Sequence, residues 1–250
     1  MQITALCRYP IKSHGREALN EVKLFAGKTM PWDRLWAVTH EATKADVQNT
    51  AWVSCHNFMI GARTPGLAGI WAKLDEANRA VTLTHQDLGE LSFCPDTPED
   101  VTRFLEWVSP LCPENRARPS GIVSAGARGM TDSDYPTLSL MNTASHRAVQ
   151  EALGKPLETE RWRGNIWFDG DTAWEEFDWI GQEVRLGEAT LAIREPIERC
   201  PHTTANPVTG QRDADTLGTL EHHFGHQNFG VYAEVIKGGM CRIGDTVVLL

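Results

Sequence analysis

The chemistry of this chain centres on one cysteine in a polar, proline-stiffened segment, residues 194–210, REPIERCPHTTANPVTG. A free cysteine is more often a buried packing residue than a reactive one. Here Arg199 directly precedes Cys200, and a neighbouring cation favours the thiolate. A thiolate can act as a nucleophile or as a soft metal ligand. On local chemistry alone, packing and function are about equally supported for Cys200.

Histidines near the C-terminal end offer two further kinds of chemistry. His202 follows Cys200 by two residues, which leaves a cysteine-dependent hydrolase open as a weak alternative. His222 and His226 have the i,i+4 spacing of a helical zinc site. The adjacent glutamate of an H-E-x-x-H motif is missing, so a polar helix end is the preferred interpretation of this pair.

Basic residues stand beside several expected strands. Lys12 and Ser13 lie in YPIKSHG, Arg34 lies in WDRLWAV, and Arg161 and Arg163 lie in ERWRGNIWFDG. Each of them alone is best interpreted as a solvated surface charge. Cationic side chains gathered at strand edges would instead bind an anionic ligand such as a phosphate.

Composition narrows the range of partners. The chain has 250 residues and a formal net charge of -9, with its Lys and Arg residues scattered. Nucleic acid and anionic membranes require a basic face, so neither is an expected partner. The N-terminus lacks the pattern of a secretory signal, and no apolar run approaches the roughly 20 residues of a membrane span. We therefore expect a cytoplasmic protein.

Two common classes of cofactor site find no support in the sequence. None of the six cysteines forms C-x-x-C with another, and none has metal-finger spacing, so we expect free thiols rather than zinc or iron–sulfur sites. No G-x-G-x-x-G loop joins a strand to a helix, which argues against a nicotinamide site.

The elements that must position these residues are mainly strands. Residues 79–85, RAVTLTH, alternate apolar and polar side chains, and similar short segments recur before residue 100 and after residue 160. Helices are expected after Thr97, from Asn142 or Thr143 to Gly154, and over 215–225. The aperiodic segment 113–136 is predicted to be a functional or linking loop. The pattern indicates a β-rich α+β fold.

Taken in order, the segments resemble a known family. YPIKS, DR before WAV, RGNIWFDG, RC followed by a P-x-TG turn, FGVYAEV and IGD occur in the order found in the MOSC family. The resemblance is to members that carry an additional N-terminal β-barrel domain, a group that includes the amidoxime reducing component. It implies a MOSC β-barrel at residues 96–250 packed with a smaller N-terminal β-barrel-like domain at residues 1–95, with an uncertain boundary at the 113–136 loop and N-terminal residues contributing to the site.

The resemblance also implies a cofactor and the residues that bind it. In that family, the cysteine matching Cys200 supplies the protein sulfur ligand of molybdenum, which is otherwise held by a molybdopterin. The positions that match the family's cofactor contacts are Lys12, Ser13, Arg34 and Arg163, together with the helix start at Asn142, Thr143 and Ser145. Arg199 is also assigned to the cofactor-binding residues, and it is expected to help keep the thiol deprotonated.

The implied activity is the reduction of N-hydroxylated or other N- or S-oxygenated small molecules. The alternative is a non-catalytic module that carries the molybdenum cofactor or transfers sulfur. No ferredoxin-like domain follows GDTVVLL. A separate ferredoxin, flavodoxin or cytochrome with its reductase is therefore the expected electron donor.

Overall fold

Short strands make up most of the regular structure of the protein, which we analysed as a computed structural model. The structure describes residues 1–44, 52–126 and 128–250, so residue 127 of the expected 113–136 loop lies outside the described part. The strands are β1 (Ile3–Arg8), β2 (Glu17–Leu19), β3 (Glu21–Leu24), β4 (Trp36–His40), β5 (Trp71–Asp75), β6 (Ala80–His85), β7 (Gly89–Phe93), β8 (Pro119–Ser124), β9 (Leu138–Asn142), β10 (Ile166–Phe168), β11 (Glu183–Leu186), β12 (Ala189–Glu198), β13 (Asn228–Lys237), β14 (Gly239–Arg242) and β15 (Val247–Leu249). The helices are α1 (Pro98–Val108), α2 (Thr143–Leu153), α3 (Glu175–Asp178) and α4 (Thr216–Phe224), with 3-10 turns η1 (Cys55–Asn57), η2 (Pro65–Gly69), η3 (Ser109–Leu111), η4 (Thr159–Trp162) and η5 (Pro201–Thr204).

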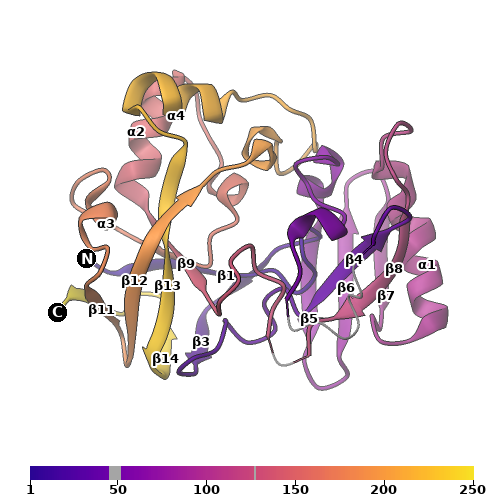
Figure 1. Cartoon of the computed structure of the whole chain (residues 1–250), viewed down its shortest axis with the longest axis horizontal. Helices are drawn as coiled ribbons and strands as arrows, with labels where there is room; N and C mark the ends of the chain where they lie inside the picture. The colour runs from indigo at the N-terminus through magenta and orange to yellow at the C-terminus, as the bar shows by residue number, and fades with distance from the viewer. Residues whose placement is uncertain (45–51, 127) are drawn as a thin grey trace.

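The larger half of the molecule is built on an eight-stranded mixed sheet (Figure 1). Its strand order is β15-β11-β12-β13-β9-β10-β1-β2. Strand β15, at one end of this order, meets β1, which is next to the other end, because Gln2 before β1 forms an antiparallel bridge with Thr246 before β15. Main-chain bonds from Ile3 N to Asp245 O and from Val247 N to Met1 O continue the contact. The sheet is therefore closed into a barrel, and the expected β-rich fold is confirmed.

The barrel is held by an apolar interior that the strand pattern creates. The first five residues of β12 are all buried, as are most residues in the middle of β13. Phe168, Leu191 and Val231 pack in the same fully buried cluster. Burying a side chain of this size stabilises the fold by about 1.5–3 kcal/mol. Strands β9 and β10 run parallel, and α2 makes the crossover that a parallel pair requires.

The smaller half contains two antiparallel sheets, β4-β8 and β5-β6-β7, around a second core. Phe104 and Val108 of α1 belong to this core, and β8 pairs with β4 along Trp36 to His40. Residues 96–124 therefore pack in the smaller half, while β1 and β2 belong to the barrel. We propose that the boundary lies between residues 125 and 137 rather than at residue 95.

The helix signals in the sequence act largely as expected. Helix α1 starts at Pro98, although the side chain of Thr97 makes no capping hydrogen bond. Helix α2 starts after Asn142, whose Oδ1 accepts a hydrogen bond from Ala144 N at 2.8 Å. It ends at Gly154, which has a left-handed φ of 74°. The start of α2 is thus capped by the side chain of Asn142.

The expected loop at 113–136 is wrong in one part, because it contains strand β8. Its sequence, PSGIVS, has too few apolar residues to show a strand period. The strand forms because its backbone pairs with β4, a partner about 80 residues earlier in the chain. No helix in the described part of the chain has the length and apolar character needed to cross a membrane.

Candidate functional site

Three tight turns bring the predicted basic residues to the junction of the two halves. Lys12 and Ser13 follow β1, Arg34 precedes β4, and Arg163 precedes β10. Ser13, Arg34 and Arg163 have φ values of 64°, 53° and 50°. Left-handed backbone is uncommon outside glycine and gathers at functional sites, where the surrounding structure supports the strain. The turns aim their side chains at one region.

Arg34 and Arg163 lie against the same buried aromatic ring. Their guanidinium carbons are 4.9 Å and 4.2 Å from the ring centroid of Tyr9. The Tyr9 hydroxyl donates to Gly164 O at 3.0 Å, which fixes the ring. Asp33 accepts from Tyr9 N at 2.9 Å and also pairs with Arg34. The Tyr9 ring therefore attracts both guanidinium groups, which offsets part of the repulsion between them.

Lys12 completes a group that we call the cation cluster: Lys12, Arg34 and Arg163. Its Nζ is 2.6 Å from Asp132 Oδ1 and donates to Met130 O at 2.7 Å. The lysine side chain is 4% exposed, but that of Asp132 is 58% exposed. Burial raises the pKa of Asp132, and the three cations outweigh it and lower the pKa to about 2. Asp132 is thus an ionised anion at the mouth of the cation cluster.

Arg163 is the member of the cluster that most lacks a counter-charge. Its Nη2 donates to the neutral carbonyl of Gly15 at 3.3 Å, and the described residues place no carboxylate in an ion pair with it. Burial lowers the pKa of Arg163 to about 10, and the charge of Arg34 adds to this effect. A partly buried guanidinium without an ion-pair partner is stabilised by an incoming anion.

Cys200 presents an exposed thiol at the start of η5, directly after β12. His202, in the same turn, is buried, and its Nδ1 has no hydrogen-bond partner among the described residues. Burial first, and then the charges of Arg163 and Arg212, lower the pKa of His202 to about 3. Such a histidine is a poor general base at neutral pH, which argues against the cysteine hydrolase.

Arg199, which directly precedes Cys200, makes several hydrogen bonds to protein groups. Its Nε donates to Phe229 O at 2.8 Å, its Nη1 to Trp162 O at 2.8 Å, and its Nη2 contacts Met141 Sδ at 3.3 Å. Burial lowers its pKa to about 10. The guanidinium therefore connects the end of β12 to Phe229, Trp162 and Met141.

The helix-start residues lie in another polar group, which we call the Glu176 network: Asn142, Ser145 and Glu176. Asn142 Nδ2 donates to Glu176 Oε2 at 2.9 Å, and Ser145 Oγ donates to Glu176 Oε1 at 2.8 Å. All three are buried. Thr143 Oγ1 accepts from Arg147. Asn142 and Ser145 thus satisfy a buried carboxylate, and the structure does not bring them to the cation cluster.

The histidine pair at the end of α4 is also separated. The helix ends at Phe224, and Gly225 follows with a left-handed φ of 76°. His226 therefore lies beyond the helix, where its ring meets Trp174 edge-on at 5.0 Å. In the described ranges, no three His, Cys, Asp or Glu side chains converge as a metal-binding group. The helical spacing of His222 and His226 is lost.

Several residues at this site have no direct signal in the sequence. Asp132 lies in the aperiodic loop, Tyr9 precedes a proline, and Cys55 is distant in sequence from Cys200. Burial raises the pKa of the Cys55 thiol, and the charges of Asp132 and Cys200 add to the effect. Covariation between contacting positions in homologous sequences would have shown that these residues lie together, but a single sequence contains no such information.

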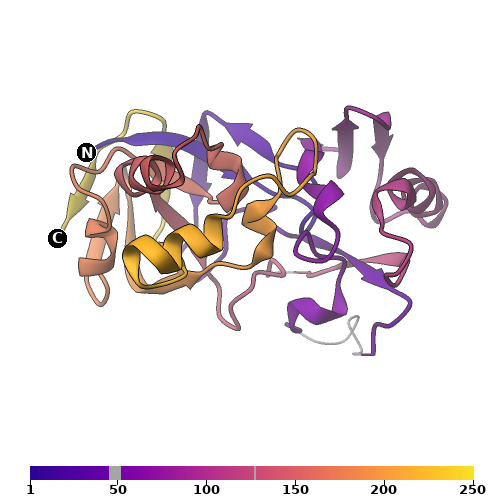
Figure 2. The same ribbon diagram turned by 90° about the horizontal axis from the view of Figure 1, so that it is seen from above.

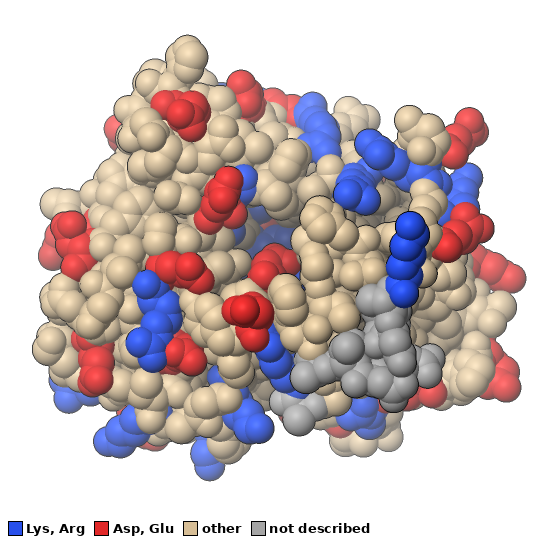
Figure 3. Space-filling model, in the orientation of Figure 1, with Lys and Arg blue, Asp and Glu red and all other residues tan. Residues whose placement is uncertain are grey.

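The segment that contains Cys55 packs across the turn that contains Cys200. A Cβ at Gly61 would lie 1.8 Å from Nδ1 of His202, so only glycine fits against that ring. Arg212 Nη2 donates to Ala62 O at 2.8 Å. Figure 3 shows a hollow between the two halves, with Lys or Arg atoms at its bottom and Asp or Glu atoms on its rim.

Comparison with known proteins identifies the larger half. Residues 129–248 match the model of the MOSC domain. This chain therefore carries a MOSC domain, and the resemblance expected from its motifs is confirmed. The match covers β9 to β15. Strand β1, which lies outside the match, completes the same barrel.

Curated relatives are similar to part of this chain. Molybdenum cofactor sulfurases from Drosophila grimshawi and Anopheles gambiae are each 34% identical to it, over 44% and 42% of this chain and 15% of each relative. The Drosophila ananassae protein of that name is 26% identical over 59% of this chain and 20% of its own length. The chain thus matches at most a fifth of these relatives.

Two solved structures are also similar. YiiM from Geobacillus stearothermophilus gives a TM-score of 0.36 at 18% identity, covering 45% of this chain and 53% of that one. The YuaD protein from Bacillus subtilis gives a TM-score of 0.45 at 12% identity, covering 99% and 94%.

The residues at the junction fit an anionic cofactor that brings its own metal. Cys200 offers one exposed soft ligand, and the cation cluster offers charge for a phosphate. His202 Nδ1 and Arg16 Nε are buried without partners among the described residues. A cavity of about 20 Å³ beside Arg34 and Asp132 has room for about one water. A larger anion at that point would compete with the Asp132 carboxylate for Lys12.

Proposed function

We propose that this protein binds a molybdenum–pterin cofactor at the junction of its two halves. The observation that carries the proposal is that the exposed Cys200 stands two residues from His202, whose pKa the charge of Arg163 lowers, so the thiol lies near a cation cluster in which Arg163 forms no ion pair with a described residue. The family match and the names of the curated relatives support the same cofactor. An anionic pterin with a phosphate would supply the missing negative charge.

Each residue has a distinct task in this proposal. The Cys200 thiolate would anchor the metal through a soft ligand. Lys12 and Arg163 would bind the phosphate or the pterin edge, and Arg34 would hold the same group while Asp33 fixes its guanidinium. When bound, the cofactor would supply two-electron redox chemistry. Ser13 follows Lys12, has a left-handed backbone, and would donate a hydrogen bond from its hydroxyl to the cofactor.

The activity that we propose is reduction of N-hydroxylated or other N- or S-oxygenated small molecules. An exposed Cys200 leaves the metal side of the site open to a small substrate. Two electrons are needed for each turnover, so we propose a separate ferredoxin, flavodoxin or cytochrome with its reductase as the donor.

Metal and pterin analysis of the freshly purified protein is the first test. We expect molybdenum and pterin in near-equal amounts. The loaded protein should reduce an N-hydroxyamidine with a chemical reductant, but not with NADH or NADPH alone. Rapid turnover with a nicotinamide and no other protein would contradict the separate donor. Purified protein without pterin, after expression in a cofactor-producing host, would contradict the proposal itself.

A module that carries the cofactor or transfers sulfur is the second candidate. The names of the curated relatives favour it, and Cys55 places a second thiol in electrostatic range of Cys200. A molybdenum-loaded protein that passes its pterin to an acceptor enzyme, and that reduces no N- or S-oxygenated compound, would select this candidate over the reductase.

A further inference from the structure

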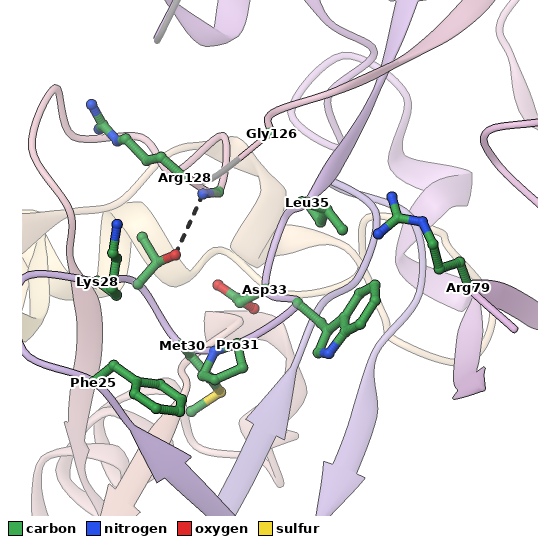
Figure 4. A pocket seen from close by; sticks show the side chains of 12 residues that line it. Phe25, Lys28, Met30, Pro31, Asp33, Leu35, Arg79, Gly126 and Arg128 are labelled. Carbon is green, nitrogen blue, oxygen red and sulfur yellow. Dashed lines mark hydrogen bonds between the residues drawn. The ribbon is translucent and has the colours of Figure 1, made fainter. Parts of the chain in front are cut away.

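Arg16 is a buried arginine that has no carboxylate partner. It is 4% exposed, and no carboxylate among the described residues forms an ion pair with it. By contrast, Arg8 pairs with two glutamates, and Arg34 pairs with Asp33 at the wall of a cavity of about 320 Å³ (Figure 4). Burial lowers the pKa of Arg16, because a charge without a counter-charge is costly inside a protein. The hydrogen bonds of its guanidinium must offset that cost.

The guanidinium of Arg16 connects the two halves of the molecule. Its Nη1 donates to Ala68 O at 2.6 Å and to Ile70 O at 3.3 Å, in and directly after η2 of the smaller half. Its Nη2 donates to Pro207 O at 2.7 Å, within the MOSC match. The guanidinium carbon lies 3.7 Å from the centroid of the Trp71 ring, which holds the guanidinium plane. A planar fork fixes its acceptors relative to one another, whereas a lysine ammonium acts as a point charge.

Pro207 lies in a hairpin, residues 205–212, that continues the turn after Cys200. An antiparallel bridge between its two end residues closes this hairpin. At its start, Ala205 N donates to His202 O at 3.0 Å in η5, the turn that begins directly after Cys200. A short, hydrogen-bonded segment therefore separates Pro207 from the thiol, so a shift of the hairpin would also shift Cys200.

The 205–212 hairpin lies directly on the smaller half. Figure 1 and Figure 2 both show it beside the segment that contains η2. A Cβ at Gly210 would lie 2.6 Å from Cα of Gly66, so the two backbones approach as closely as glycine permits. Arg212 also donates across this contact, to Ala62 O, but it is exposed, and water can replace its hydrogen bonds. Arg16 makes the buried connection.

The backbone beside Arg16 supports the cation cluster. Gly15 O accepts from Arg163 Nη2 at 3.3 Å, and Lys12 lies four residues before Arg16 in the tight segment after β1. The side chain of Arg16 thus reaches the hairpin that follows Cys200, while its neighbours in the chain hold or supply the cations.

We propose that Arg16 is a positioning residue that fixes the Cys200 thiol relative to the cation cluster. Its fork holds the 205–212 hairpin, and with it the thiol, at one place relative to Lys12 and Arg163. A ligand that contacts both the thiol and the cations gains affinity from this arrangement, because its second contact forms at an effective concentration set by the geometry. The inference rests on the proposed function, in which one ligand contacts both groups.

The test compares the alkylation rates of Cys200 by iodoacetate and by iodoacetamide in the whole chain without cofactor, measured by peptide mass spectrometry. Both reagents need the thiolate, so the ratio of the two rates does not depend on how much thiolate is present. The cation cluster should attract iodoacetate and raise this ratio about tenfold or more above that of Cys200 in the urea-unfolded chain. Arg16→Lys keeps the charge but loses the planar fork, so the ratio should fall several-fold.

Further variants separate position from stability. Arg8→Lys alters another buried arginine, whose side chain donates to glutamates and not to the hairpin, so the ratio should stay unchanged. Trp71→Ala removes the half-exposed ring that orients the Arg16 guanidinium, so the ratio should fall, but less than in Arg16→Lys. Sulfate affinity of the cation cluster should be the same in all three variants, and urea unfolding reports their stability.

The outcomes distinguish this inference from the proposed function. A raised ratio that is equal in the native protein, Arg16→Lys and Trp71→Ala would overturn the role of Arg16 alone. A ratio that falls in Arg16→Gln but not in Arg16→Lys would show that Arg16 acts through its charge, and would also overturn positioning. A native ratio no higher than that of the unfolded chain would contradict both this inference and the proposed function.

Discussion

The cation cluster, which is partly buried, and the Glu176 network, which is fully buried, both lie at the ends of barrel strands, yet they differ in how well their charges are satisfied. In the Glu176 network, Asn142 and Ser145 donate directly to the Glu176 carboxylate. In the cation cluster, Arg163 contacts a neutral carbonyl and the Tyr9 ring but forms no ion pair with a described residue, and Lys12 depends on the exposed carboxylate of Asp132. A polar network whose hydrogen bonds are all formed stabilises a fold, whereas a group of charges without counter-charges is typical of a binding site. Partners therefore distinguish structure from function better than residue types do.

The largest effect should come from the thiol beside the cation cluster. Cys200→Ser should lower reductase turnover by about 100-fold or more and remove bound molybdenum, because a serine hydroxyl is harder and is not ionised at neutral pH. Metal analysis and a reduction assay on the same preparation measure both. Cys94→Ser changes a cysteine outside the cation cluster and serves as the control. Full activity in Cys200→Ser would end the ligand assignment.

The cluster itself should control retention of the cofactor. Lys12→Ala and Arg163→Ala should each weaken cofactor binding roughly 10- to 150-fold, the equivalent of a charge-assisted hydrogen bond of about 1.5–3 kcal/mol. Molybdenum content after gel filtration measures the loss. Arg103→Ala, an exposed arginine on α1, is the matched control. Unchanged occupancy with an altered substrate preference would instead place these residues on the substrate side.

The Glu176 network should respond in the opposite way. Ser145→Ala removes a buried hydrogen bond to a carboxylate and should lower the free energy of unfolding by about 1–3 kcal/mol. Cofactor content per folded molecule should stay the same. Urea unfolding and metal analysis measure the two quantities. Loss of cofactor without loss of stability would return Ser145 to the binding site and remove the contrast between the two groups.

The pH dependence of the free energy of unfolding also tests the structural role of the Glu176 network. Burial raises the pKa of Glu176 above its usual value of 4.5, although hydrogen bonds from Asn142 and Ser145 oppose it. The folded state then holds this proton more tightly than the unfolded state, so its contribution to stability is full below pH 4.5 and is lost as pH rises through the folded pKa. Urea unfolding over this range should show a smaller decline in Glu176→Gln. An identical decline in both proteins would refute the assignment.

The smallest effect concerns the anion already present in the cation cluster. Asp132→Asn removes the carboxylate that competes with an incoming ligand for Lys12, so sulfate or phosphate should bind up to about fivefold more tightly, the range of an exposed ion pair. Titration with sulfate measures the change. Asp134→Asn in the same segment is the control. Weaker sulfate binding in Asp132→Asn would show that Asp132 supports the anion site instead of occupying it.

Local signals in the sequence were sufficient for much of the fold. The alternation over residues 79–85 produced β6, and the Asn142 and Gly154 signals bounded α2. Capping and alternation act within a few residues, so they can be interpreted without a partner. Strand β8 was not predicted because its pairing partner, β4, is far away in the chain. Local patterns thus identified elements, and long-range pairing placed them.

The sequence by itself determined the ordered motifs, and through them the MOSC resemblance and the residues Lys12, Arg34, Arg163 and Cys200. Only the tertiary structure decided what these residues face. It turned Arg199 toward backbone carbonyls. It set Asp132 against a lysine 120 positions away. The physical reason is that a charge is defined by its residue type, but its energy depends on burial and on partners that the chain brings together only when it folds.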